Sequence, residues 1–317
     1  MRAISDYLHD VRRVAIGGHV NPDGDCIGSC MALYLYLKDC FPEISADVYL
    51  QNLPGGFDYL KGLENIRFEV EENAEYDLLI LLDIGSADRV GVIGGLPEKT
   101  EKVLVIDHHR TNPGGYTWFF NDPDISSASE FLWHFLDPDR ISPDCAAALY
   151  TGIVHDTGVF QYSNTTPETM RIAAGLMEKG IPASRIIDES YYQKSYVQQM
   201  ALGKVLCSSR IHLNGRCISG FLTMEDMQSM GLKSTDMDGI VSQLRNTEGT
   251  DVAIFLYPVR DGFYKVSLRS RQITDVSRIA VQFGGGGHIR AAGCSASGDP
   301  GKIIEDLVKL AGEQLQL

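Results

Sequence analysis

We predict an α/β protein, with a parallel sheet covered by helices in the first half of the chain and a smaller α+β domain in the second. The first half alternates short apolar runs with helical patterns, which is typical of strands joined by crossover helices. The second half contains two hairpin patterns, turned at Asn214-Gly215 and Asp261-Gly262, and two helical segments. A length of 317 residues favours about two domains.

Each element follows from its local pattern. The strand candidates of the first half are the apolar runs at 14–18, 46–50, 78–83 and 103–107. The helix candidates there are 27–38, a segment after the capping-box pattern Ser127-Ala-Ser-Glu130, one beginning at Thr166-Pro167, and one from about 146 that carries Asp156 near its end. In the second half we expect hairpins over 210–223 and 251–271 and helices over 234–246 and 299–314. The polar helical pattern at 186–207 predicts a connector between domains at 1–185 and 208–317, with a cleft between them.

Composition limits the class of partner. The net charge of -14 argues against binding to long nucleic acid, which needs a broad cationic face. Residues 260–290 nevertheless hold six basic and two acidic residues, and this +4 window suits a small phosphorylated ligand. The seven cysteines form no CxxC pair and are expected to be reduced thiols. Without a long apolar run or a signal-peptide pattern, we expect a cytoplasmic protein that does not enter the membrane.

Four acidic and histidine-bearing segments each stand at the end of an apolar run: His19 to Asp25, Asp83, Asp107-His108-His109 and His155-Asp156. Parallel strands place their carboxyl ends at one edge of a sheet, so these segments can share one site. Aspartates gathered there would repel each other by about 3 kcal/mol per pair at ~5 Å and an effective dielectric constant near 20, unless cations lay between them. Mixed carboxylate and imidazole ligands favour manganese, zinc, iron or magnesium. We predict two divalent metal ions, with manganese(II) as the first choice.

The same segments carry a family resemblance. HVNPDGD, LLDIGSADR, VIDHHRTN and GIVHDTGVF resemble the four motifs of the DHH phosphoesterase superfamily, and KVSLRSR, DVSRIAVQF and GGGGHIRAAG are similar to its DHH-associated C-terminal domain. The resemblance covers nearly the whole chain. It is nearest to the nano-RNase branch, oligoribonucleases that also dephosphorylate 3'-phosphoadenosine 5'-phosphate (PAP). It implies a Rossmann-like catalytic domain followed by a substrate-binding domain.

The resemblance also implies roles for single residues. One metal would be held by His19, Asp23 and Asp83, and the other by Asp25, Asp83, His108 and Asp156, so that Asp83 bridges the two. His109 would contact the scissile phosphate, either neutralising charge or protonating the leaving alkoxide. Asp107 either orients a ligand imidazole or caps the strand end. The catalytic candidates are therefore Asp83, Asp107 and His109. His155 points about 100° away from Asp156 on a helix and is expected to pack rather than bind metal.

The +4 window supplies the candidates for substrate binding. Gly284 to Gly287 can form an anion-binding nest, although the run can also be a flexible loop. Arg269 and Arg271 alternate along a strand and share a face, where they would bind a terminal phosphate or lie as solvated charges. With the phosphate contact, the substrate-binding candidates are His109, Arg269, Ser270, Gly285, Gly286, Gly287 and His288. Arg89, Arg110 and Asn112 are weaker candidates beside the motifs.

The expected activity is hydrolysis of short oligoribonucleotides to nucleoside 5'-monophosphates, together with dephosphorylation of PAP. Cyclic di-AMP or linear pApA are alternative substrates with the same catalytic half. An exopolyphosphatase or pyrophosphatase is disfavoured, because it would need no domain that faces a base. A nucleotide sensor conflicts with the complete set of metal-ligand residues, and an RNA-binding structural protein conflicts with the negative charge. The sequence leaves open whether the protein forms a homodimer.

Overall fold

The structure is a computed structural model that describes residues 3–86, 89–110 and 112–316. Ala87, Asp88 and Thr111, which belong to two of the motif segments, lie outside the described residues. The chain divides into two compact units, Met1–Gln193 and Lys194–Leu317. The segment expected to be a connector at 186–207 is divided between them, because its first helical turns pack within the first unit.

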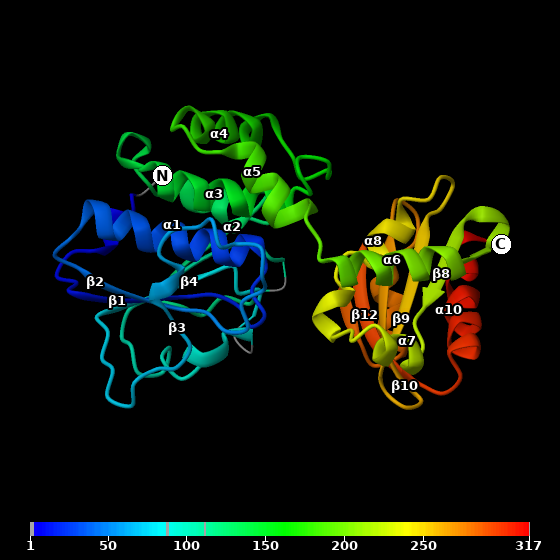
Figure 1. Cartoon of the computed structure of the whole chain (residues 1–317). Coiled ribbons are helices and arrows are strands. Elements are labelled where there is room, and N and C mark those ends of the chain that lie inside the picture. The colour runs from blue at the N-terminus through cyan, green and yellow to red at the C-terminus, as the bar shows by residue number, and fades with distance from the viewer. Residues whose placement is uncertain (1–2, 87–88, 111, 317) are drawn as a thin grey trace. The chain divides into compact units, whose positions relative to one another are not determined.

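The first unit contains a six-stranded parallel sheet in the order β3-β2-β1-β4-β5-β6 (Figure 1). The strands are β1 (Arg13–Gly17), β2 (Ser45–Tyr49), β3 (Ile66–Arg67), β4 (Leu78–Leu82), β5 (Val103–Asp107) and β6 (Trp118–Asn121). The chain runs from β1 outward to β3 and then returns to the other side of β1 as β4. The strand order therefore reverses between β1 and β4, the position where open α/β sheets bind ligands.

Helices cover one face of this sheet, whereas loops and the short helix η4 (Gly91–Ile93) cover the other. The helices of the unit are α1 (Gly24–Cys40), α2 (Ala128–Trp133), α3 (Pro143–Asp156), α4 (Pro167–Glu178), α5 (Ala183–Ile187) and the π-helix η6 (Asp188–Tyr192). Helices α1 and α3 lie side by side (Figure 1) and touch through glycine. A Cβ on Gly28 would lie 2.5 Å from the Ala148 carbonyl oxygen and 2.8 Å from the Gly152 backbone nitrogen.

The second unit contains a mixed, mainly antiparallel sheet in the order β11-β12-β10-β9-β8-β7. Its strands are β7 (Arg210–His212), β8 (Cys217–Phe221), β9 (Val252–Arg260), β10 (Phe263–Ser270), β11 (Gly286–His288) and β12 (Ala291–Ser297). Its helices are α6 (Tyr196–Ser208), α7 (Met224–Ser229), α8 (Ile240–Arg245), α9 (Val276–Gln282) and α10 (Pro300–Leu315). Separate apolar clusters pack on its two faces, which confirms the predicted α+β class. Among the described residues, no helix is long and apolar enough to cross a membrane.

Candidate metal centre

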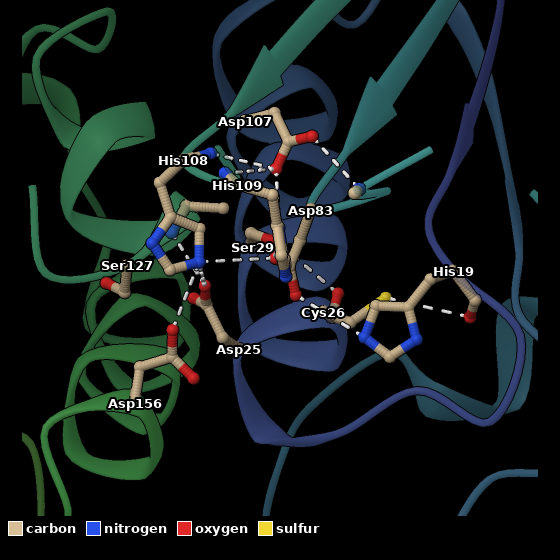
Figure 2. Close-up of polar contacts among 12 residues, drawn as sticks. His19, Asp25, Cys26, Ser29, Asp83, Asp107, His108, His109, Ser127 and Asp156 are labelled. Carbon is tan, nitrogen blue, oxygen red and sulfur yellow. Dashed lines mark hydrogen bonds and ion pairs between the residues drawn. The ribbon is translucent and has the colours of Figure 1, made fainter. Parts of the chain in front are cut away.

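The predicted ligand segments meet at the carboxyl edge of the parallel sheet. His19 follows β1, Asp83 follows β4, and the Asp107 to His109 segment ends β5, while Asp25 and Asp156 come from the facing ends of α1 and α3 (Figure 2). Three groups of side chains have ligand atoms within 4.8 Å of one another: His19, Cys26 and Asp83; Asp83, His108 and His109; and Asp25, His108 and Asp156. Segments that are far apart in the sequence thus share one small region beside the strand ends.

Asp83 connects these groups through its two carboxylate oxygens. Oδ2 lies 3.5 Å from His19 Nε2, and Oδ1 lies 3.4 Å from His108 Nε2. Oδ1 is buried and accepts no hydrogen bond from the described residues, an arrangement that is costly unless a cation binds there. The backbone of Asp83 is left-handed, with φ of 55°. Left-handed non-glycine residues are uncommon and gather at functional sites, and here the turn directs the side chain between the two histidines.

His19 is oriented by its own loop. Its Nδ1 lies 2.8 Å from the Val20 carbonyl oxygen, which can only accept, so Nδ1 donates and Nε2 is the ring nitrogen that faces the site. Nε2 lies 3.8 Å from Asp23 Oδ1. Asp23 caps α1 by accepting from the backbone N–H groups of Asp25 and Cys26, and its side chain is 59% exposed. Asp23 belongs to none of the three ligand groups named above, and its exposed carboxylate lies beside the His19 ring.

Asp25 is held from a different element. Its two oxygens accept hydrogen bonds from the backbone N–H groups of Ala128 and Ser129, at 2.6 and 2.9 Å. These N–H groups open α2, whose dipole favours a negative charge at that end. His108 Nε2 lies 3.1 Å from Asp156 Oδ2 and 3.9 Å from Asp25 Oδ2, and these three side chains form the third of the groups named above (Figure 2). Asp25 is fully buried, so its position is fixed before any ligand binds.

The pKa shifts of the ionisable groups in the site favour a bound cation. Burial raises the pKa of Asp156 to about 6 and, together with the Asp83 and Asp156 carboxylates, raises the pKa of Asp25. Burial alone would lower the pKa of His19, but the Asp23 and Asp83 carboxylates outweigh it and raise the pKa to about 10. These shifts reflect a concentration of negative charge that a divalent cation would neutralise. The residues present fit two divalent ions.

Asp107 organises the strand end behind the ligands. Its carboxylate accepts hydrogen bonds from the Gly85 and His108 backbone N–H groups, at 3.0 and 2.8 Å, and lies 2.8 Å from His109 Nδ1. Asn112 also donates to it. Burial would raise the pKa of Asp107, but the hydrogen bonds from His109 and Asn112 overcome that effect and lower it to about 2. Asp107 therefore caps the strand end, and the imidazole that it contacts is that of His109 and not that of the predicted ligand His108.

Several features of the site were not found from the sequence. Cys26 was not among the predicted ligands, yet its sulfur belongs to the first ligand group (Figure 2). The anchoring of Asp25 by α2 depends on residues about 100 positions away in the chain, and the sequence carries no signal for it beyond the helix-start pattern. Among the weaker candidates, Asn112 supports Asp107, and Arg110 forms an exposed ion pair with Asp124 at 2.9 Å.

Comparison with known proteins identifies the family. The DHH family, N-terminal domain, matches residues 13–153, and the DHHA1 domain matches residues 221–316. The bifunctional oligoribonuclease and PAP phosphatase NrnA of Thermus thermophilus is 32% identical over 99% of this chain and 94% of its own. The chain belongs to the DHH family.

Further relatives agree with that membership. The bifunctional oligoribonuclease and PAP phosphatase NrnA of Bacillus subtilis is 27% identical to this DHH-family chain over 99% of it and 98% of the relative. The crystal structure of an exopolyphosphatase-related protein from Bacteroides fragilis aligns with a TM-score of 0.89 at 24% identity, covering 98% of this chain and 94% of that one. This structural match shows the shared fold. The predicted resemblance and the predicted fold class are both confirmed.

The substrate-binding candidates of the DHHA1 region have different surroundings. Arg269 is half-buried on β10, and His288 is exposed on β11. Ser270 is 1% exposed, and its hydroxyl donates to the Ile289 carbonyl oxygen, which places it in a supporting position rather than at a ligand-facing surface. Strand β10 ends at Ser270, so Arg271 does not continue the strand face of Arg269 as the alternation predicted; its guanidinium donates to the Arg245 carbonyl oxygen.

The glycine run is half strand and half connecting segment. Gly286 and Gly287 belong to β11, which pairs with β12. A Cβ on Gly285 would lie 2.2 Å from the Gly293 carbonyl oxygen, and one on Gly287, where φ is 142°, would lie 2.5 Å from that of Ala291. These two glycines allow the backbones to approach closely, a requirement that is independent of any ligand.

Proposed function

We propose that this protein is a two-metal phosphoesterase that hydrolyses short oligoribonucleotides to nucleoside 5'-monophosphates and removes the 3'-phosphate of PAP. The observation that carries the proposal is the Asp83 carboxylate, whose two oxygens face two different histidine-containing ligand groups. A carboxylate placed in this way suits a pair of ions held close together. The substrate class is supported by the two NrnA relatives, which align over nearly the whole chain.

The proposed ligand sets are those expected from the family resemblance, and all their members except Asp23 belong to the ligand groups at the sheet edge. His19, Asp23 and Asp83 would hold one ion, and Asp25, Asp83, His108 and Asp156 the other. Two bound divalent ions, with manganese(II) as the preferred metal, would supply Lewis acidity and activate the attacking water. Cys26 would lie next to the first ion without being needed as a ligand.

The chain's own residues would orient the substrate and balance its charge. His109 is positioned by the contact of its Nδ1 with Asp107, so Nε2 is the ring atom that a phosphate oxygen would meet. There the imidazole either stabilises the charge that develops on the phosphoryl oxygens or protonates the leaving alkoxide. In the DHHA1 region, Arg269, His288 and the backbone around Gly285 to Gly287 would bind the terminal nucleotide, with Ser270 supporting them from beneath.

A substrate panel tests the proposal. RNAs of two to five nucleotides, PAP, pApA, cyclic di-AMP and pyrophosphate should be compared on one preparation, with Mn²⁺ and with Mg²⁺. We expect release of mononucleotides from short RNA and of phosphate from PAP, with Mn²⁺ the better metal. Preference for pApA or cyclic di-AMP would favour the alternative phosphodiesterase, and turnover of pyrophosphate alone would favour a pyrophosphatase. Nucleotide binding without product would indicate a sensor.

Ligand variants test the centre itself. Asp83→Asn retains a residue that tolerates a left-handed backbone, and His108→Ala removes the imidazole shared by the second group. Each should reduce turnover by more than the roughly 10- to 100-fold that the loss of an outer partner costs. Asp39→Ala, on the exposed part of α1, and His9→Ala are matched controls that should retain activity. Undiminished Mn²⁺-dependent cleavage by Asp83→Asn and His108→Ala would show that the centre lies elsewhere.

A further inference from the structure

His155 is the penultimate residue of α3, and its ring is enclosed on several sides. The ring lies 5.3 Å from that of Phe57 and 5.6 Å from that of Tyr191, measured between centroids. Its Nε2 lies 3.0 Å from Ser190 Oγ. The Ser190 hydroxyl itself donates to the Ile186 carbonyl oxygen at 2.7 Å, so His155 Nε2 is the donor in their contact. The imidazole is therefore fixed from the side of the π-helix η6.

Another side of the ring faces Gly24. A Cβ placed on Gly24 would lie 2.1 Å from His155 Cγ and 2.4 Å from Nδ1, so the ring occupies the space that any other residue would need. Gly24 is the first residue of α1 and stands between Asp23 and Asp25 in the sequence. Its backbone is not left-handed, so the ring contact, and not the conformation, requires glycine here.

The two aspartates beside Gly24 differ in how they are held. Asp25 is fully buried and anchored by two backbone N–H groups of α2. Asp23 is largely exposed, and the hydrogen bonds to its carboxylate come from its own helix. The direction of the Asp23 side chain therefore depends on the position of the first turn of α1. The His155 ring packs against Gly24, the first residue of that turn. His155 itself belongs to none of the three potential ligand groups among the described residues.

We infer that His155 is a positioning residue that sets the place of Gly24, and thereby of Asp23, in the proposed ligand set of His19, Asp23 and Asp83. The inference rests on the two-metal centre proposed above. The ion proposed to bind His19, Asp23 and Asp83 would be affected in particular, because Asp25, a ligand of the other ion, has its own anchor on α2. Loss of the ring should weaken the binding of one Mn²⁺ and leave the other close to its normal affinity.

Four variants and one direct measurement of metal binding test this role. Mn²⁺ titrations followed by electron paramagnetic resonance give the number of bound ions and their affinities without any substrate. We expect His155→Ala to weaken one of the two ions by about 10- to 100-fold, the range for partners that orient ligands. Gly24→Ala should weaken it at least as much, because its Cβ overlaps the ring. Ser190→Ala retains the ring against Gly24 and should stay within about threefold of the wild type.

The double variant separates this contact from a general loss of structure. Once the ring has been removed, Gly24→Ala has room, so His155→Ala/Gly24→Ala should bind Mn²⁺ no worse than His155→Ala alone. If Gly24→Ala does not fold, recovery of a cooperative urea transition in the double variant supports the contact, and failure to recover contradicts it. Wild-type affinity for both ions in His155→Ala overturns the inference. Two tightly bound ions without phosphoesterase activity would instead overturn the proposed function and leave the role of His155 standing.

Discussion

Replacing Asp107 by asparagine should reveal how much the fold and the metal centre depend on one buried carboxylate. The pKa of Asp107 is about 2 in the folded protein, against 3.8 for the unperturbed group. Because the folded value is the lower one, the ionised carboxylate stabilises the fold above pH 4, and this contribution is lost as the pH falls toward 2. A difference of nearly two pKa units corresponds to about 2 kcal/mol. The residue is fully buried, so solvent does not screen this contribution.

Urea unfolding of the metal-free protein at pH 7 measures that contribution. We expect Asp107→Asn to lower the free energy of unfolding by about 2 kcal/mol and the affinity for Mn²⁺ by roughly 10- to 100-fold, because the His108 and His109 segment loses its acceptor. Asp77→Asn is a matched control. The Asp77 carboxylate also accepts two backbone N–H groups, from Arg12 and Arg13, but it lies at the other end of β4 from Asp83. The Asp77→Asn protein should lose stability without losing affinity for Mn²⁺. An Asp107→Asn protein as stable as the wild type and with unchanged Mn²⁺ affinity would refute the reasoning.

Two further expectations concern the metal centre and its surroundings, and a third concerns the substrate-binding candidates of the second unit. Stabilisation by Mn²⁺, measured as the rise in melting temperature, should grow from pH 5.5 to 8, because carboxyls such as Asp156, with a pKa of about 6, must lose protons to bind metal; a pH-independent rise would count against this. Gly152→Ala places a Cβ 1.9 Å from a buried serine oxygen and should destabilise the protein by about 1–3 kcal/mol, whereas Gly175→Ala, with open space around it on α4, should be neutral or stabilising. In steady-state assays on PAP, Arg269→Ala should raise KM more than Arg271→Ala, because Arg269 lies within β10 whereas Arg271 follows the end of that strand; equal effects would contradict the assignment.

The main strands of the first unit could be predicted because burial on both faces makes them continuous apolar runs. Strands β1, β2, β4 and β5 begin or end within one residue of the predicted ranges. Strand β3 has only two residues, and β6 is half-buried along its length, so neither presents such a run. Strand β11 consists of two glycines and a histidine, and residues of low strand propensity become a strand there through pairing with β12.

The residues that meet at the candidate site could be predicted from their positions in the chain. The contacts that hold them there depend on packing and could not be predicted. The acidic residues and histidines stand directly after apolar strands in the sequence, and that position alone predicts that His19, Asp83 and His108 lie together. The left-handed backbone of Asp83, the anchoring of Asp25 and the nearness of Cys26 arise from contacts between distant elements. The sequence contains the residues for these contacts but does not indicate which of them pair.

The glycine contact between α1 and α3 has a consequence for the choice of metal. Asp25 lies one turn before Gly28 on α1, and Asp156 lies one turn after Gly152 on α3, so the separation of these carboxylates is set by two backbones in direct contact. Backbones that touch cannot move closer to suit a smaller ion. In the proposed centre, ions of different radius would therefore be accommodated by the imidazole of His108, which a loop carries, and not by movement of the two helices. Selection among metals would then depend on how far that loop can adjust while α1 and α3 stay in contact.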